Sequence, residues 1–88
     1  MKAAFRTSFV RDLKKVKQHE VLARVHQVIE EVEAATNLWA IGNLKKITGT
    51  ADFYRIRIGE YRVGIVVEGE TVVFVRCLPR RDLYRFFP

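Results

Sequence analysis

Apolar residues alternate with polar or charged ones along residues 53–67, which read FYRIRIGEYRVGIVV. A period of two predicts β-strands with one apolar face, and Gly59-Glu60 at the break predicts a tight hairpin turn. A two-residue loop would place Arg57 opposite Arg62 and Arg55 opposite Gly64. The apolar face would then carry Tyr54, Ile56, Ile58, Tyr61, Val63, Ile65 and Val67.

Two stretches before this hairpin have the apolar spacing of helices. Thr7-Ser8 is expected to cap the first helix, whose apolar residues are Phe9, Val10, Leu13 and Val16. The second helix is expected from roughly Glu20 to Ala35. Because their connection is short, the two stretches form either a helical hairpin on one face of a sheet or one kinked helix.

Shorter patterns predict the remaining elements. Residues 2–6 and 44–47 are expected to be brief strands, separated from the hairpin and helices by loops at 36–43 and 48–52. Trp39 lies in the first loop, where we expect it to cover an edge of the core rather than stack on a base. Thr71–Leu78 is expected to be a third long strand, which Pro79 ends.

The facing of this last strand depends on the turn before it. A two-residue loop at Gly69-Glu70 would direct Val72, Phe74 and Arg76 toward the core, whereas a three-residue loop would direct Val73, Val75 and Cys77 there. We favour the three-residue loop, because burying an arginine without a partner costs several kcal/mol in order of magnitude. Arg76 would then lie beside Arg62.

The order of these elements predicts an α+β fold, β-α-α-β-β-β(-β), in one domain spanning residues 1–88. We expect a twisted antiparallel sheet, an N-terminal helical hairpin on one of its faces, and a short C-terminal tail or helix.

The composition gives the chain a positive net charge and argues against secreted, membrane-spanning and metal-binding proteins. The 88 residues carry a net charge of +6, which favours polyanionic partners. The one cysteine, Cys77, lies in an apolar run and indicates a reducing, cytoplasmic setting. No export signal or membrane span is predicted. His19 and His26 lack a third ligand, and no cofactor or metal motif is present, so we expect neither.

The candidate chemistry lies on the arginine face of the hairpin. Like charges placed opposite each other destabilise a sheet, so the facing arginines suggest a bound anion such as an RNA phosphate. If the tail PRRDLYRFFP folds back over this face, Arg80 or Arg81 and Tyr84 would approach them. Arginine can stabilise phosphate charge but cannot accept a proton. Tyr84 is therefore the best-placed proton acceptor, unless it only fixes the tail by packing; the residues alone favour neither role.

The segment LKKITGTADFYRIRIGEYRVGIVV, followed by a strand and RRDLYR, resembles the RelE branch of the RelE/ParE toxin superfamily. The resemblance covers essentially the whole chain and implies a RelE-like fold. It also implies a toxin of a type II toxin-antitoxin system that cleaves mRNA in the ribosomal A site by 2′-hydroxyl attack on the adjacent phosphate. Its partners would be a cognate antitoxin, mRNA and the 70S ribosome, with no cofactor.

Carried over by position, the resemblance assigns the catalytic roles to Arg55, Arg57, Arg62, Arg80 and Tyr84. The nearby basic residues Lys45, Lys46, Arg76 and Arg81 are candidates for binding RNA. Pro79 stands where many relatives have a histidine, and Arg55 and Arg57 stand where some have lysines. Two alternatives are a ParE-like gyrase inhibitor and a non-catalytic RNA- or ribosome-binding relative.

Overall fold

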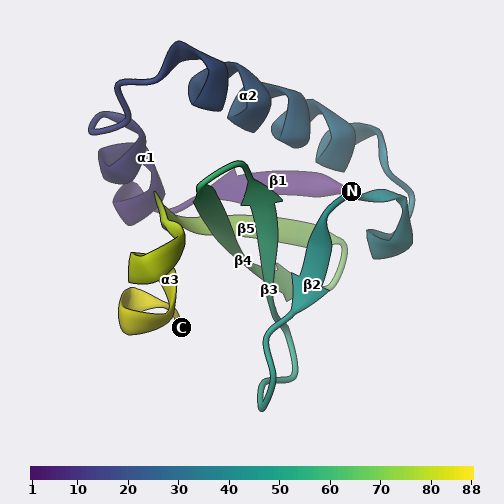
Figure 1. Cartoon of the computed structure of the whole chain (residues 1–88). Coiled ribbons are helices and arrows are strands. Elements are labelled where there is room, and N and C mark those ends of the chain that lie inside the picture. The colour runs from purple at the N-terminus through teal and green to yellow at the C-terminus, as the bar shows by residue number, and fades with distance from the viewer.

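The computed structural model describes residues 1–88 and shows a five-stranded sheet with helices on both sides (Figure 1). The elements in chain order are β1 (Lys2–Phe5), α1 (Thr7–Leu13), α2 (His19–Ala34), a 3₁₀ turn (Leu38–Ala40), β2 (Leu44–Lys46), β3 (Phe53–Ile58), β4 (Tyr61–Glu68), β5 (Thr71–Pro79) and α3 (Arg80–Phe86). The predicted α+β class and element order are confirmed, and the tail is a helix.

The sheet is mixed rather than wholly antiparallel. Its strand order is β1-β5-β4-β3-β2, and the neighbouring strands from β2 to β5 pair antiparallel. β1 instead pairs parallel with β5, from Lys2 opposite Thr71 to Phe5 opposite Phe74. The expectation of an antiparallel sheet is therefore wrong at this edge. The helices α1 and α2 provide the long connection that a parallel partner requires.

The two N-terminal helices are separate, as the helical-hairpin alternative predicted, and they lie on one face of the sheet (Figure 1). The predicted cap is wrong: Arg6 is the N-cap residue and no side chain caps α1, because Thr7 is already helical. The Ser8 hydroxyl donates instead to the Val75 carbonyl oxygen at 2.6 Å. The helix also ends at Leu13, before Val16, although Val16 is buried.

The β3–β4 hairpin has the predicted register. Ile58 lies opposite Tyr61, Arg57 opposite Arg62, and Arg55 opposite Gly64. Ile56, Ile58, Val63 and Ile65 of the predicted apolar face are fully buried, and Tyr54, Tyr61 and Val67 pack against the same core. Residues from α1 and α2 complete this core, which lies between the helices and the sheet.

A β-bulge changes the facing of β5 partway along the strand. The turn before β5 has two residues, because Glu68 pairs with Thr71, and so Val72 and Phe74 face the core. The three-residue loop that we favoured is therefore wrong. Between the pairs Gly64–Arg76 and Ile65–Phe74, Val75 is left as an extra residue. The extra residue reverses the alternation, and Cys77 rather than Arg76 reaches the core.

Asp12 of α1 binds the part of β5 that extends past β1. Its carboxylate, only 5% exposed, accepts hydrogen bonds from the Cys77 amide at 2.9 Å and from Arg76 Nε at 2.7 Å. Arg76 Nη2 also donates to it at 3.1 Å. α1 therefore covers an edge that would otherwise expose unpaired backbone groups.

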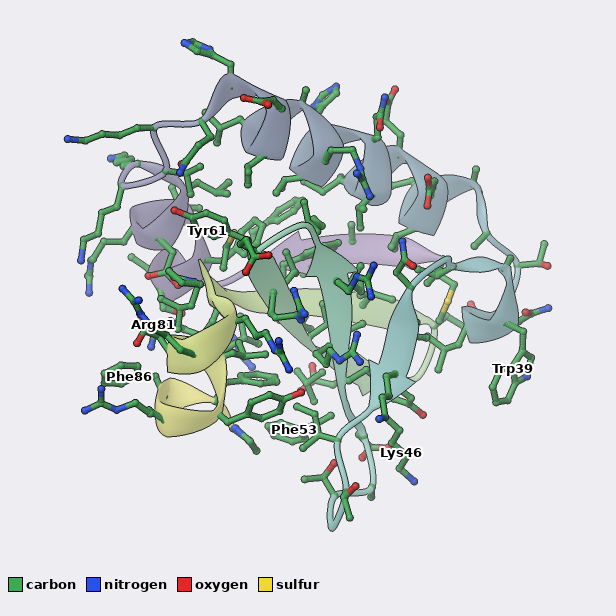
Figure 2. The ribbon with its side chains drawn as sticks, viewed as in Figure 1. Trp39, Lys46, Phe53, Tyr61, Arg81 and Phe86 are labelled. Atoms are coloured by element: carbon green, nitrogen blue, oxygen red, sulfur yellow. The ribbon has the colours of Figure 1, made fainter.

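The opposite face of the sheet is covered in part by α3, through the buried side chains of Leu83 and Phe87. Trp39 does not cover the core edge as expected, because its side chain is 90% exposed on the 3₁₀ turn, far from α3 in Figure 2.

None of the helices has the length and apolar character needed to cross a membrane.

Candidate active site

The face of the sheet that α1 and α2 leave open carries rows of arginines. Paired residues point to the same side, so one row holds Arg57 and Arg62, and the next holds Arg55 and Gly64. No carboxylate forms an ion pair with any of these three arginines. Their charge is therefore not neutralised within the protein.

Arg62 is the most enclosed of these arginines, with 8% of its surface exposed. Its Nη1 donates to the carbonyl oxygens of Gly59 at 2.7 Å and of Tyr61 at 2.9 Å, which fixes the guanidinium against the hairpin turn. Burial, followed by the charges of Arg55, Arg80 and Arg57, lowers the pKa of Arg62, while Tyr84 opposes that shift. The residue is thus held in a concentrated positive field.

Arg55 contributes a buried donor without a partner. Its Nη1 lies 3.5 Å from the Asn43 carbonyl oxygen, a weak contact. Its Nε is buried without a hydrogen-bond partner. A buried donor that stays unpaired costs about 1–3 kcal/mol, which an anionic acceptor would remove.

The helix α3 brings the tail residues to this face. Its first backbone amide, on Arg80, donates to the Glu60 carbonyl oxygen at 2.7 Å and ties the helix to the hairpin turn. Arg80 and Tyr84 are four residues apart and so share a side of the helix. Both lie close enough to Arg62 to affect its pKa, and Tyr84 is 58% exposed. The predicted approach of the tail to the arginines is therefore present.

An open cavity of about 690 Å³ lies between α3 and the hairpin turn. Its lining residues are Gln18, Glu60, Tyr61, Pro79, Arg80, Arg81 and Tyr84. The sequence interpretation did not include Gln18, Glu60 or Tyr61 among the site residues. Glu60 and Tyr61 could have been included, because the sequence predicts the hairpin turn beside which the tail would fold. No local sequence pattern indicates that Gln18 lines the cavity. Figure 2 shows Tyr61 and Arg81 on the α3 side of the molecule.

The four candidates for RNA binding lie in different places. Lys45 pairs with Arg55 and shares its face, and Arg81 lines the cavity. Lys46 pairs with Tyr54, so it belongs to the opposite face, and in Figure 2 it lies apart from Arg81. Arg76 is occupied by Asp12. The structure thus brings Lys45 to the arginine face, places Arg81 at the cavity beside α3, removes Lys46 from the arginine face, and gives Arg76 a structural contact.

Comparison with known proteins shows that the chain is similar to toxins. A family model described as the ParE toxin of a type II toxin-antitoxin system, parDE, matches residues 4–84. Toxin RelE3 of Methanocaldococcus jannaschii is 43% identical over 89 residues, with all of both chains covered.

Two crystal structures of antitoxin-toxin complexes are also similar. The RelB-RelE complex from Methanococcus jannaschii has a chain with 40% identity and a TM-score of 0.83, covering 97% of this chain and 99% of that one. The RelBE2 complex from Mycobacterium tuberculosis has a chain with 27% identity and a TM-score of 0.70, covering 90% of this chain and 96% of that one.

Proposed function

We propose that this chain, which belongs to the RelE branch of the RelE/ParE toxins of type II toxin-antitoxin systems, cleaves mRNA on the ribosome. The family and the RelE-like fold expected from the sequence are confirmed by the same comparisons. The proposal concerns the activity, its substrate and its residues.

The observation that supports cleavage is the field around Arg62. Four arginines, Arg55, Arg57, Arg62 and Arg80, gather without a neutralising carboxylate partner, and one of their donors is buried and unpaired. Such a cluster suits a phosphate whose charge increases during reaction. Tyr84 beside it adds a group that can accept a proton, which the arginines cannot.

In the proposed reaction, Tyr84 accepts the proton of a ribose 2′-hydroxyl as its oxygen attacks the adjacent phosphorus. Arg62 and its neighbours stabilise the charge on the nonbridging oxygens. The bond from phosphorus to the 5′-oxygen breaks, and that oxygen takes up a proton from solvent water. The products are a 2′,3′-cyclic phosphate and a 5′-hydroxyl end. Lys45 and Arg81 hold flanking phosphates.

We also propose that a cognate antitoxin neutralises the chain. The similar solved structures from Methanococcus jannaschii and Mycobacterium tuberculosis are toxin-antitoxin complexes, which supports a partner of this kind. An acidic antitoxin would complement the net charge of +6.

Primer extension on mRNA undergoing translation tests the activity and its residues. Replacing Tyr84 by Phe should lower the cleavage rate by about 10²–10⁴-fold, the range for a positioned general base. Arg62→Lys should lower it by about 10²–10³-fold, because lysine keeps the charge but loses the planar set of donors. Mapping the new ends should show a cyclic phosphate.

Controls come from the same residue types elsewhere. Tyr54→Phe, on the helix-covered face, and Arg6→Ala, in an exposed pair with Glu68 at 3.9 Å, should both cleave at the wild-type rate. If Glu60→Gln abolished cleavage while Tyr84→Phe did not, Tyr84 would not be the proton acceptor. Wild-type protein that leaves mRNA intact but inhibits gyrase in a supercoiling assay would instead identify a ParE-like toxin.

A further inference from the structure

The C-terminal end of α3 packs against a glycine of β4, the central strand of the sheet. We propose that Phe87, seated on Gly64, positions α3 so that Tyr84 and Arg80 face Arg62. This inference rests on the proposed function and adds two positioning residues to it. Neither residue has chemistry of its own to contribute.

The contact between Gly64 and Phe87 is unusually close. A Cβ atom at Gly64 would lie 2.7 Å from Phe87 Cδ2 and 2.8 Å from Phe87 Cγ. Real Cβ atoms essentially never approach so closely, and the aromatic ring cannot bend aside. Gly64 does not have a positive φ, unlike Gly49, Gly59 and Gly69. The ring therefore requires glycine here, whereas the backbone conformation does not.

The residues around Gly64 show that its lack of a side chain leaves room for the Phe87 ring. Gly64 lies between Arg55 on β3 and Arg76 on β5, in the row next to the pair Arg57–Arg62. The ring of Phe87 occupies this gap and is 3% exposed. It also meets Phe53, with ring centroids 5.4 Å apart, and Figure 2 shows Phe53 near the end of α3. Phe87 is thus held from below by Gly64 and from the side by Phe53.

The geometry of α3 links this contact to the reacting groups. Leu83 and Phe87 are four residues apart and form the buried side of the helix, and the Phe87 amide donates to the Leu83 carbonyl oxygen at 2.8 Å. Tyr84 follows Leu83 directly and therefore lies on a different side of the helix, the side that also carries Arg80. The amide of Arg80 fixes one end of the helix to Glu60, and Phe87 fixes the other. Releasing either end would let the Tyr84 hydroxyl move away from Arg62.

The test uses kcat and KM on translating ribosomes. Gly64→Ala should lower kcat by about 10²-fold, the cost of misplacing a catalytic group by about 1 Å, with a smaller effect on KM. Adding Phe87→Leu should restore much of the lost kcat, because the smaller side chain accommodates the new methyl group. Gly42→Ala is the matched control, since a Cβ atom there would meet nothing within 4 Å.

Amide hydrogen exchange gives a readout that does not depend on cleavage. Gly64→Ala should speed exchange in α3, including the Phe87 amide, while exchange in the sheet stays at the wild-type rate. If wild type does not cleave but this change appears, the proposed function fails and the positioning role stands.

Three results would overturn the positioning role. These are wild-type kcat with unchanged exchange in Gly64→Ala, an equal loss in Gly42→Ala, or no recovery in the double variant. Should Gly64→Ala fail to fold, Phe87→Ala must lower kcat more than Phe87→Leu does.

Discussion

Removing the buried carboxylate of Asp12 should be among the most destabilising single changes in this chain. Asp12→Ala leaves the Cys77 amide without its acceptor and Arg76 without its counter-charge. Breaking a buried ion pair costs about 3–5 kcal/mol. Because the Arg76 side chain is 24% exposed and part of its charge reaches water, we expect the lower end, about 3 kcal/mol. A chain of this length has about 4–13 kcal/mol of stability in total.

Two further variants separate the contributions of the amide and the charge. Asp12→Asn keeps an oxygen for the Cys77 amide and should lose less, about 1.5–3 kcal/mol. The double variant Asp12→Ala, Arg76→Met should also lose less than Asp12→Ala alone, because no unpaired charge remains near the core.

Urea unfolding followed by circular dichroism measures these differences, since the single Trp39, 90% exposed in the native state, would report little. Glu30→Ala breaks the exposed contact with His26, 3.8 Å apart, and should change stability by less than about 0.5 kcal/mol. A loss in Asp12→Ala no larger than in this control would refute the reasoning. So would an Arg76→Met change that leaves the loss undiminished.

The remaining predictions concern the core thiol and the arginine face. Burial, and then Asp12, raise the pKa of Cys77 from 9.0 to about 12, so the folded state keeps a proton that the unfolded state loses. Stability should therefore fall between about pH 9 and pH 12, more steeply in wild type than in Cys77→Val, and the thiol should resist disulfide reagents until unfolding. Replacing Arg57 by Gln should raise the free energy of unfolding by about 0.2–1 kcal/mol while lowering mRNA cleavage, because it relieves the repulsion with Arg62. Sulfate should raise the melting temperature of wild type more than that of this variant, and equal increases would argue against an anion site.

Local periodicity was enough to predict the parts of the fold that depend on neighbouring residues. The β3–β4 register followed from alternation across a two-residue turn, and α2 was predicted to within one residue at each end. The arginine face followed from the same alternation, because paired residues in a hairpin share a side.

The errors arose where residues far apart in the chain decide the outcome. The bulge at Val75 reverses the facing of β5, and the partner that makes Arg76 acceptable, Asp12, lies 64 residues earlier. The sequence groups Lys46 with the arginines because it does not give the register of β2 against β3, and a shift of one residue moves every side chain of a strand to the other face. The contact of Phe87 with Gly64 depends on how α3 crosses the sheet, which no local pattern encodes.

The parallel pairing of β1 with β5 also determines when the chain can fold during its synthesis. Lys2 pairs with Thr71, which is made 69 residues later. At about 5–20 residues per second, β1 waits roughly 3–14 s for its partner strand to be translated. During that interval the apolar sides of α1 and α2 have no sheet to cover, and the arginine face does not yet exist. While it is still being translated, the chain therefore spends several seconds open to chaperones and proteases and without an assembled site.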